Sequence, residues 1–151
     1  NYHPENSHVM ASLIRKFCEA AKTKSEEVIC WGTGSPFREF LHVEDLASAV
    51  TFLLDYWYPN SISSPKDVSG KPLFHLNVGT GKDISIKVLA KKIAKLSGFK
   101  GKIIWDKDKP DGTPRKLLDI SKIKSLGWEP VINLDMGIKL AIEDYKKKYL
   151  S

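Results

Sequence analysis

The segment from Val28 to Asp45 constrains the fold more than any other part of the sequence. A short β-branched run over residues 28–31 favours a strand, and five turn-forming residues follow it at 32–36. Residues 38–43 again favour a strand, and Glu44 then begins a helix. A strand, a tight turn, a second strand and a helix in this order predict an α/β fold.

The apolar spacing in the rest of the chain continues this alternation. Helices are expected over residues 8–22, 44–56, 121–126 and 134–149, and strands over 28–31, 38–43, 73–78 and 102–105. A further helix is expected to open at Asp83 or Ser85 and to stop at Gly98. In the helix over 44–56, the residues expected on the inner face are Leu46, Val50, Leu53 and Leu54. Residues 58–72 are rich in Ser, Pro, Asn and Gly, which favours a surface loop. We therefore expect residues 1–151 to be a single domain.

Composition limits the classes of protein and partner. The chain is 42% hydrophobic and 28% charged, and no run approaches the roughly 18 apolar residues that a membrane span needs. Two cysteines, Cys18 and Cys30, provide no disulfide framework and suit a reducing cytoplasm. The formal net charge of +6 favours an anionic partner. The lysine runs lack interleaved aromatic residues, so they indicate solvated helix faces and no nucleic-acid surface.

Several nucleotide and metal motifs are absent. Gly32-Thr33-Gly34 and Gly79-Thr80-Gly81 both lack the third glycine of a dinucleotide fingerprint. No tyrosine has a lysine four residues later, and the four histidines show no metal-ligand spacing with the cysteines. The sequence thus predicts no metal site and no complete redox site. Because the chain opens on Asn1, we expect it to be the later part of a longer protein.

Arg38 is the strongest binding candidate from residue chemistry alone. It follows the glycine turn directly, and its guanidinium can bind a phosphate with two hydrogen bonds beside the indole of Trp31. The alternative is a surface arginine that pairs with Glu39 or Asp45. Two other residues have equally simple alternatives, since His8 can be a capping histidine and Lys16 a solvated helix lysine.

Five segments together resemble one family. Residues 1–9, 31–34, 38–45, 77–81 and 109–119 look like the GDP-L-fucose synthase family of extended short-chain dehydrogenases. The middle segments are shared by many nucleotide-sugar epimerases and dehydratases, while the first and last are typical of this family. The resemblance implies the C-terminal substrate-binding portion of such an enzyme, without the N-terminal Rossmann domain.

The resemblance also implies roles for individual residues. His8 matches the family histidine that acts as an acid in epimerisation and lies close to the nicotinamide, so it is both a catalytic and a cofactor-binding candidate. The residues that match positions contacting the nucleotide-sugar are Lys16, Trp31, Arg38 and Asp111. Lys116 is a weaker candidate for the same site.

The implied reaction epimerises GDP-4-keto-6-deoxy-D-mannose at carbons 3 and 5 and reduces its carbon 4 ketone with NADPH. NADP(H) would be held mainly by the missing domain, so the chain alone is expected to be inactive. A cytoplasmic homodimer is expected for the whole protein. Two alternatives stay open: another nucleotide-sugar epimerase or dehydratase, and a non-catalytic basic module that binds nucleotides or RNA.

Overall fold

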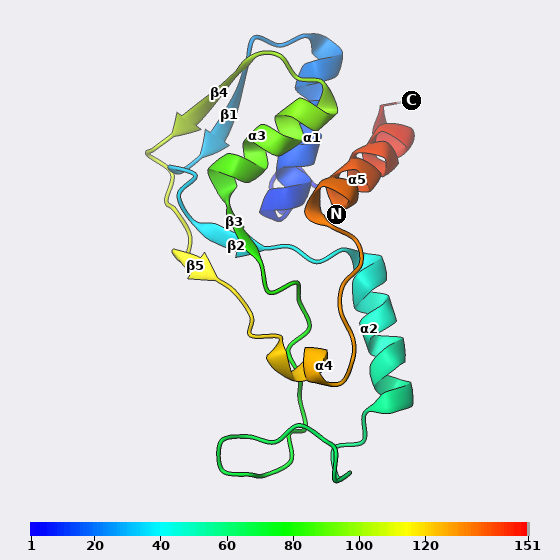
Figure 1. The fold of residues 1–151 in the computed structure, drawn as a ribbon. Helices are drawn as coiled ribbons and strands as arrows, with labels where there is room; N and C mark the ends of the chain where they lie inside the picture. Colours follow the sequence, from blue (N-terminus) through cyan, green and yellow to red (C-terminus); the bar gives the residue numbers. More distant parts are fainter. Residues whose placement is uncertain (151) are drawn as a thin grey trace. The chain divides into compact units, whose positions relative to one another are not determined.

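The computed structural model describes residues 1–150, which form five helices and five short strands (Figure 1). In chain order these are α1 (Val9–Thr23), β1 (Glu27–Trp31), β2 (Phe37–Glu39), α2 (Val43–Tyr56), β3 (Asp83–Ser85), α3 (Ile86–Ser97), β4 (Lys102–Asp106), β5 (Arg115–Lys116), α4 (Ser121–Ser125) and α5 (Leu134–Tyr149). The predicted α/β class is confirmed.

The chain forms two compact units. Unit 1 comprises residues 1–38, 84–115 and, in the last segment, 135–150, and unit 2 comprises residues 39–83 and 116–134. The chain changes from one unit to the other at four points along the sequence. Three of these points fall within the short strands β2, β3 and β5. Most of the predicted substrate-binding residues belong to unit 1.

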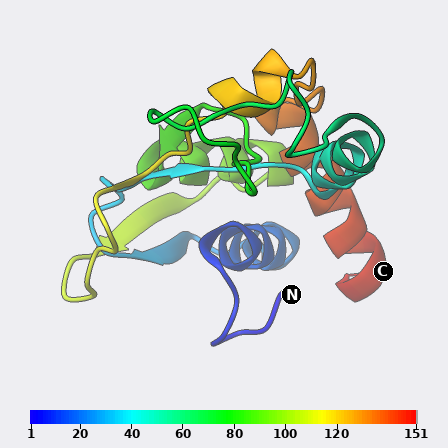
Figure 2. The ribbon, with the colours of Figure 1, turned by 90° about the horizontal axis from the view of Figure 1, so that it is seen from below.

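The core of unit 1 lies between helices and a two-stranded parallel sheet. Strands β1 and β4 pair with Val28 opposite Ile103 and Cys30 opposite Trp105 (Figures 1 and 2). Alternate residues of β1 are buried, as expected for a strand with one covered face. The buried helical residues come from three helices: Leu13, Ile14, Phe17 and Cys18 of α1, Leu89, Ala90 and Ile93 of α3, and Ile138, Ile142 and Tyr145 of α5.

The ends of α3 follow from its sequence. The side chain of Ser85 accepts a hydrogen bond from the backbone N–H of Val88 at 3.3 Å, which caps the first turn. Gly98 ends the helix with φ of 88°, a left-handed conformation that costs glycine little. Of the two predicted starting residues, Asp83 and Ser85, the structure has Ser85 as the cap, and the predicted end at Gly98 is confirmed.

The core of unit 2 is a smaller cluster. Ala49 of α2 packs with Ile120, Ile123 and Trp128, and partly buried hydrophobic residues surround them. The buried carboxylate of Asp45 accepts hydrogen bonds from the backbone N–H groups of Val131 and Ile132 at 3.1 and 3.0 Å. Burying a charge is costly unless it is hydrogen-bonded, and these two donors stabilise it.

The predicted inner face of α2 is largely wrong. Leu46, Val50 and Leu54 are 45, 50 and 75% exposed, whereas Ala49 is fully buried and Leu53 packs against the cluster. Apolar residues occur on most sides of this helix, so their spacing alone did not select one face. In the structure, the buried stripe is the one that carries Asp45 and Ala49.

Two predicted strands also differ. No strand forms over residues 73–78, where the backbone N–H of Leu73 donates to Pro65 but no strand of residues 1–150 pairs with the segment. A strand requires a neighbouring ladder, which propensity cannot provide. The strand expected over 38–43 is shorter, because β2 ends at Glu39 and His42 caps α2 by accepting from the N–H of Glu44.

Candidate functional site

Two cavities of unit 1 share three lining residues, Val9, Trp31 and Ile86. The first cavity has a volume of about 240 Å³ and is also lined by Pro4, Glu5, Ser7, Ser12, Leu13, Lys16, Cys30 and Trp105. The second has a volume of about 160 Å³ and is also lined by Gly34, Pro36, Arg38, Pro110, Asp111 and Gly112. The structure therefore brings four predicted substrate-binding residues to these two cavities: Lys16, Trp31, Arg38 and Asp111.

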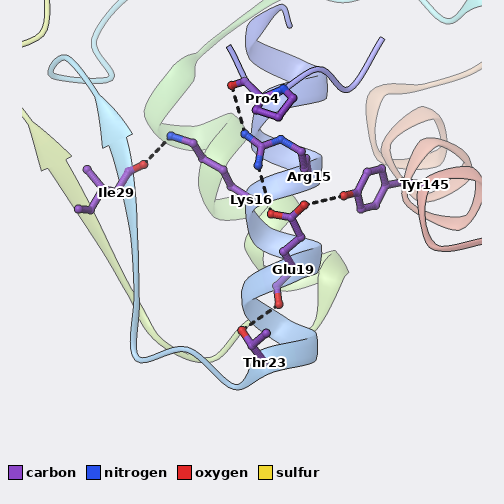
Figure 3. Close-up of polar contacts among 7 residues, drawn as sticks. All are labelled: Pro4, Arg15, Lys16, Glu19, Thr23, Ile29 and Tyr145. Carbon is purple, nitrogen blue, oxygen red and sulfur yellow. Dashed lines mark hydrogen bonds and ion pairs between the residues drawn. The ribbon is translucent and has the colours of Figure 1, made fainter. Parts of the chain in front are cut away.

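Trp31 is one of the three residues that line both cavities. It ends β1, and its side chain is 64% exposed, which is high for a large aromatic residue. Lys16 projects from α1 and donates to the carbonyl oxygen of Ile29 at 2.9 Å (Figure 3). Its ammonium nitrogen lies 5.8 Å from the centroid of the Trp31 ring, within cation–π range. An exposed aromatic face beside a fixed cation suits a ligand that has both a ring and a negative charge.

Arg38 lies at the second cavity and is half-buried. Its Nη1 donates to the carbonyl oxygen of Phe37 at 2.6 Å, and its Nη2 lies so close to Gly112 that a Cβ there would be 2.9 Å away. Glycine at position 112 thus leaves room for the guanidinium. Within residues 1–150, no ion pair joins Arg38 to a carboxylate.

The two carboxylates that the sequence offered as partners for Arg38 have other partners inside unit 2. Asp45 is bound as described above. Glu39 accepts from the backbone N–H groups of Thr80 and Gly81 at 2.5 and 2.6 Å, and from that of Leu118 at 3.0 Å. Both carboxylates therefore stabilise the backbone of unit 2.

Asp111 joins two loops. Its carboxylate accepts from the backbone N–H of Thr33 at 2.9 Å, from the hydroxyl of Thr33 at 2.6 Å and from the hydroxyl of Ser35 at 3.5 Å. These hydrogen bonds, led by that of the Thr33 hydroxyl, lower the pKa of Asp111 below its usual value. The loop over residues 107–114 is thereby held against the turn over residues 32–36.

His8 and Lys116 line neither cavity. His8 is the exposed N-cap residue of α1, and its side chain makes no capping hydrogen bond. Neither cavity is lined by His8, although its neighbours Ser7 and Val9 line the first. Lys116 is exposed in β5 and belongs to unit 2, whereas His8 and the four cavity residues belong to unit 1.

Two residues that line the cavities and one that lies near the Trp31 ring were not predicted. Trp105 lines the first cavity, and its ring lies where a side chain on Gly34 would be, since a Cβ there would be 2.5 Å from the indole. Ile86, at the start of α3, lines both cavities. Lys109 places its ammonium nitrogen 5.6 Å from the centroid of the Trp31 ring. Trp105 could have been found only from the parallel pairing of β1 with β4, which places it opposite Cys30. That pairing belongs to the tertiary structure and cannot be read from the local sequence.

A polar network fixes one wall of the first cavity. Arg15 donates to Glu19 at 3.1 Å and to the carbonyl oxygen of Pro4 at 3.4 Å, and Tyr145 donates to Glu19 at 2.9 Å (Figure 3). Burial, with the hydrogen bond to Glu19, raises the pKa of Tyr145 to about 12. Tyr2 adds an edge-on ring contact with Tyr145 at 4.7 Å between centroids. The first residues of the chain, in dark blue in Figure 2, are thus anchored to α1 and α5.

The described residues offer no phosphate loop for a dinucleotide. The turn over 32–36 leads into β2, and Gly79-Thr80-Gly81 leads into β3, so neither opens a helix directly. No group of three or more His, Cys, Asp or Glu side chains within residues 1–150 could hold a metal ion. Over the same residues, no helix is long and apolar enough to cross a membrane.

A family model and a solved structure indicate the class of protein that this chain resembles. Residues 1–65 match the NAD dependent epimerase/dehydratase family. The fold is also that of a C. jejuni protein described as a GDP-6-OMe-4-keto-L-xylo-heptose reductase, with 31% identity, a TM-score of 0.84, and coverage of 98% of this chain and 50% of that one. The chain is thus similar to enzymes of the NAD dependent epimerase/dehydratase family.

The particular relatives are GDP-L-fucose synthases. The chain is 51% identical over 97% of its length to a probable GDP-L-fucose synthase 1 of Oryza sativa subsp. japonica. It is 44% identical over 91% of its length to the GDP-L-fucose synthase of Escherichia coli strain K12. It spans 40% and 42% of the lengths of these two relatives. The resemblance found in the sequence is confirmed.

Proposed function

We propose that residues 1–151 are the substrate-binding domain of a GDP-L-fucose synthase, and that this domain binds the GDP-sugar. The observation that carries the proposal is the grouping of Lys16, Trp31 and Arg38 around the two cavities of unit 1. The high identity to enzymes of that name supports the same assignment.

The chemistry of the cavities suits a nucleoside diphosphate. Lys16 and Arg38 supply positive charge for the two phosphates, and the guanidinium plane can form two parallel hydrogen bonds with phosphate oxygens. The exposed indole of Trp31 can pack against the flat or apolar part of the ligand. Binding energy at this end of the ligand can position the sugar at the reacting end.

The proposed reaction begins at the sugar. A ketone at carbon 4 acidifies the protons on carbons 3 and 5, because the resulting carbanion delocalises onto the oxygen. Removal of a proton from one face and its return on the other inverts each centre. We propose that His8 returns a proton, since an imidazole can both take up and release a proton close to neutral pH.

NADPH would supply the hydride that reduces carbon 4. Because the chain spans only 40% and 42% of the lengths of two GDP-L-fucose synthase relatives, residues outside this chain would hold the cofactor. The chain alone should therefore bind the nucleotide-sugar without turning it over. For the whole protein we propose a cytoplasmic homodimer that engages neither nucleic acid nor membrane, a proposal that rests on the sequence.

The test is a titration of the purified chain with GDP, GDP-mannose and a short RNA at two salt concentrations. We expect saturable binding of both guanine nucleotides, with only a moderate effect of salt. A basic RNA-binding module would prefer the RNA, and its affinity would fall steeply with salt because binding releases many counterions. Preference for RNA, or no binding of GDP, would refute the proposal.

A substrate comparison distinguishes the other enzymatic alternative. The middle sequence motifs are shared with epimerases and dehydratases that use other nucleotides, so the same titration should include UDP and UDP-glucose. We expect the chain to bind GDP and GDP-mannose more tightly than the uridine compounds. Equal or tighter binding of UDP-glucose would favour another nucleotide-sugar enzyme.

A further inference from the structure

Two lysines, not one, lie at the exposed indole of Trp31. The ammonium nitrogen of Lys109 is 5.6 Å from the ring centroid, and that of Lys16 is 5.8 Å from it. Lys109 directly precedes Pro110, Asp111 and Gly112, which line the second cavity with Arg38. The backbone of Lys109 therefore adjoins the lining of that cavity, and its ammonium nitrogen lies near the ring of Trp31.

The loop that carries Lys109 is fixed on both sides of it. Before it, Asp106 ends β4, and its carbonyl oxygen accepts from the N–H of Lys109 at 3.3 Å, while its carboxylate accepts from the N–H of Asp108 at 3.2 Å. After it, the carboxylate of Asp111 is bound to Thr33 by two hydrogen bonds. These hydrogen bonds anchor the backbone on both sides of Lys109.

The charges of this group are not balanced within it. Lys16, Arg38 and Lys109 carry three positive charges against the two negative charges of Glu5 and Asp111, and no ion pair in the described part of the chain joins any of the three cations to a carboxylate. Of the two acidic residues that line the cavities, Asp111 directs its oxygens at hydroxyl and backbone donors of the turn. Gathering like charges costs free energy, and a dianionic ligand offsets that cost.

We propose that Lys109 is a further ligand-binding residue, whose ammonium donates to the phosphate oxygens of a nucleoside diphosphate held at Trp31. This inference rests on the proposed function, since it assigns one more contact to the same ligand. It also gives Asp111 a positioning role, because its hydrogen bonds to Thr33 hold the loop that carries Lys109.

The test compares Lys109→Gln with Lys107→Gln, an exposed lysine of the same loop whose ammonium group, among the described residues, has no cation–π contact with Trp31. GDP and guanosine are titrated into the wild-type chain and each variant, and thermal melting checks the fold. Lys109→Gln should weaken GDP binding about tenfold, as expected for one charged hydrogen bond. It should leave guanosine binding unchanged, because guanosine has no phosphate. Lys107→Gln should change neither, and Lys109→Arg should keep most of the GDP affinity.

Three results would overturn the inference while the proposed function stands. These are an unchanged GDP affinity in Lys109→Gln, an equal loss of guanosine binding in that variant, and an equal loss of GDP affinity in Lys107→Gln. The second would make Lys109 a structural residue, and the third would indicate a diffuse effect of net charge. A wild-type chain that binds no GDP would instead refute the proposed function and this inference together.

Discussion

Replacement of Arg38 separates a binding role from a structural one. The guanidinium donates to the carbonyl oxygen of its neighbour Phe37 and otherwise borders the second cavity. A hydrogen bond to a charged group contributes roughly 1.5–3 kcal/mol, so Arg38→Ala should weaken GDP binding about ten- to a hundredfold. Arg38→Lys should recover only part of this affinity, because a point charge replaces a planar donor that can form two bonds.

The same variants should fold almost normally. The one hydrogen bond lost inside the chain, to Phe37, contributes about 1 kcal/mol, and a change of this size moves the melting temperature by roughly 2–4 °C in a chain of 151 residues. Isothermal titration with GDP and thermal melting of the same samples provide both quantities. Lost stability with unchanged GDP affinity would make Arg38 a structural residue and remove it from the proposed site.

Three further predictions concern other residues. Glu39→Gln should lower the free energy of unfolding by about 1–3 kcal/mol in urea titrations, because an amide nitrogen cannot accept from the N–H of Leu118; no loss would mean that this carboxylate is dispensable. Tyr145 has a pKa raised from 10.0 to about 12 in the folded chain, so its stabilising contribution is complete below pH 10 and is lost as the pH rises toward 12. Urea unfolding at pH 9, 10 and 11 should show that Tyr145→Phe reduces this alkaline loss, and an identical pH profile would contradict it. In a longer protein that contains this chain and is active, His8→Gln should block epimerisation while GDP binding persists, and wild-type rates of deuterium exchange at carbons 3 and 5 would show that His8 has another role.

The site could be predicted in part because two of its residues are adjacent to local signals. Arg38 follows a glycine turn that sequence reveals directly, and Trp31 ends a short β-branched run just before it. Lys16 and Asp111 required the family resemblance, since a helix lysine and a loop aspartate have no local signature of binding. Lys109 was not predicted, because its approach to Trp31 depends on the hydrogen bonds of Asp111 across about 80 residues of sequence.

Some features of the secondary structure are likewise determined by residues that are close together in the sequence. Helix boundaries at Ser85 and Gly98 follow from capping chemistry within a few residues, so the sequence by itself determined them. The α/β class follows from the order of apolar periods along the chain, which is likewise local.

Only tertiary structure decided the features that need a distant partner. Residues 73–78 have the composition of a strand but lack a paired neighbour among residues 1–150, and α2 buries the stripe of Ala49 in place of the larger Leu46 and Val50. In both cases the local sequence allows more than one arrangement of similar free energy. Backbone pairing and the shape of the surrounding core then select one of them, and neither can be read from residues that are close together in the chain.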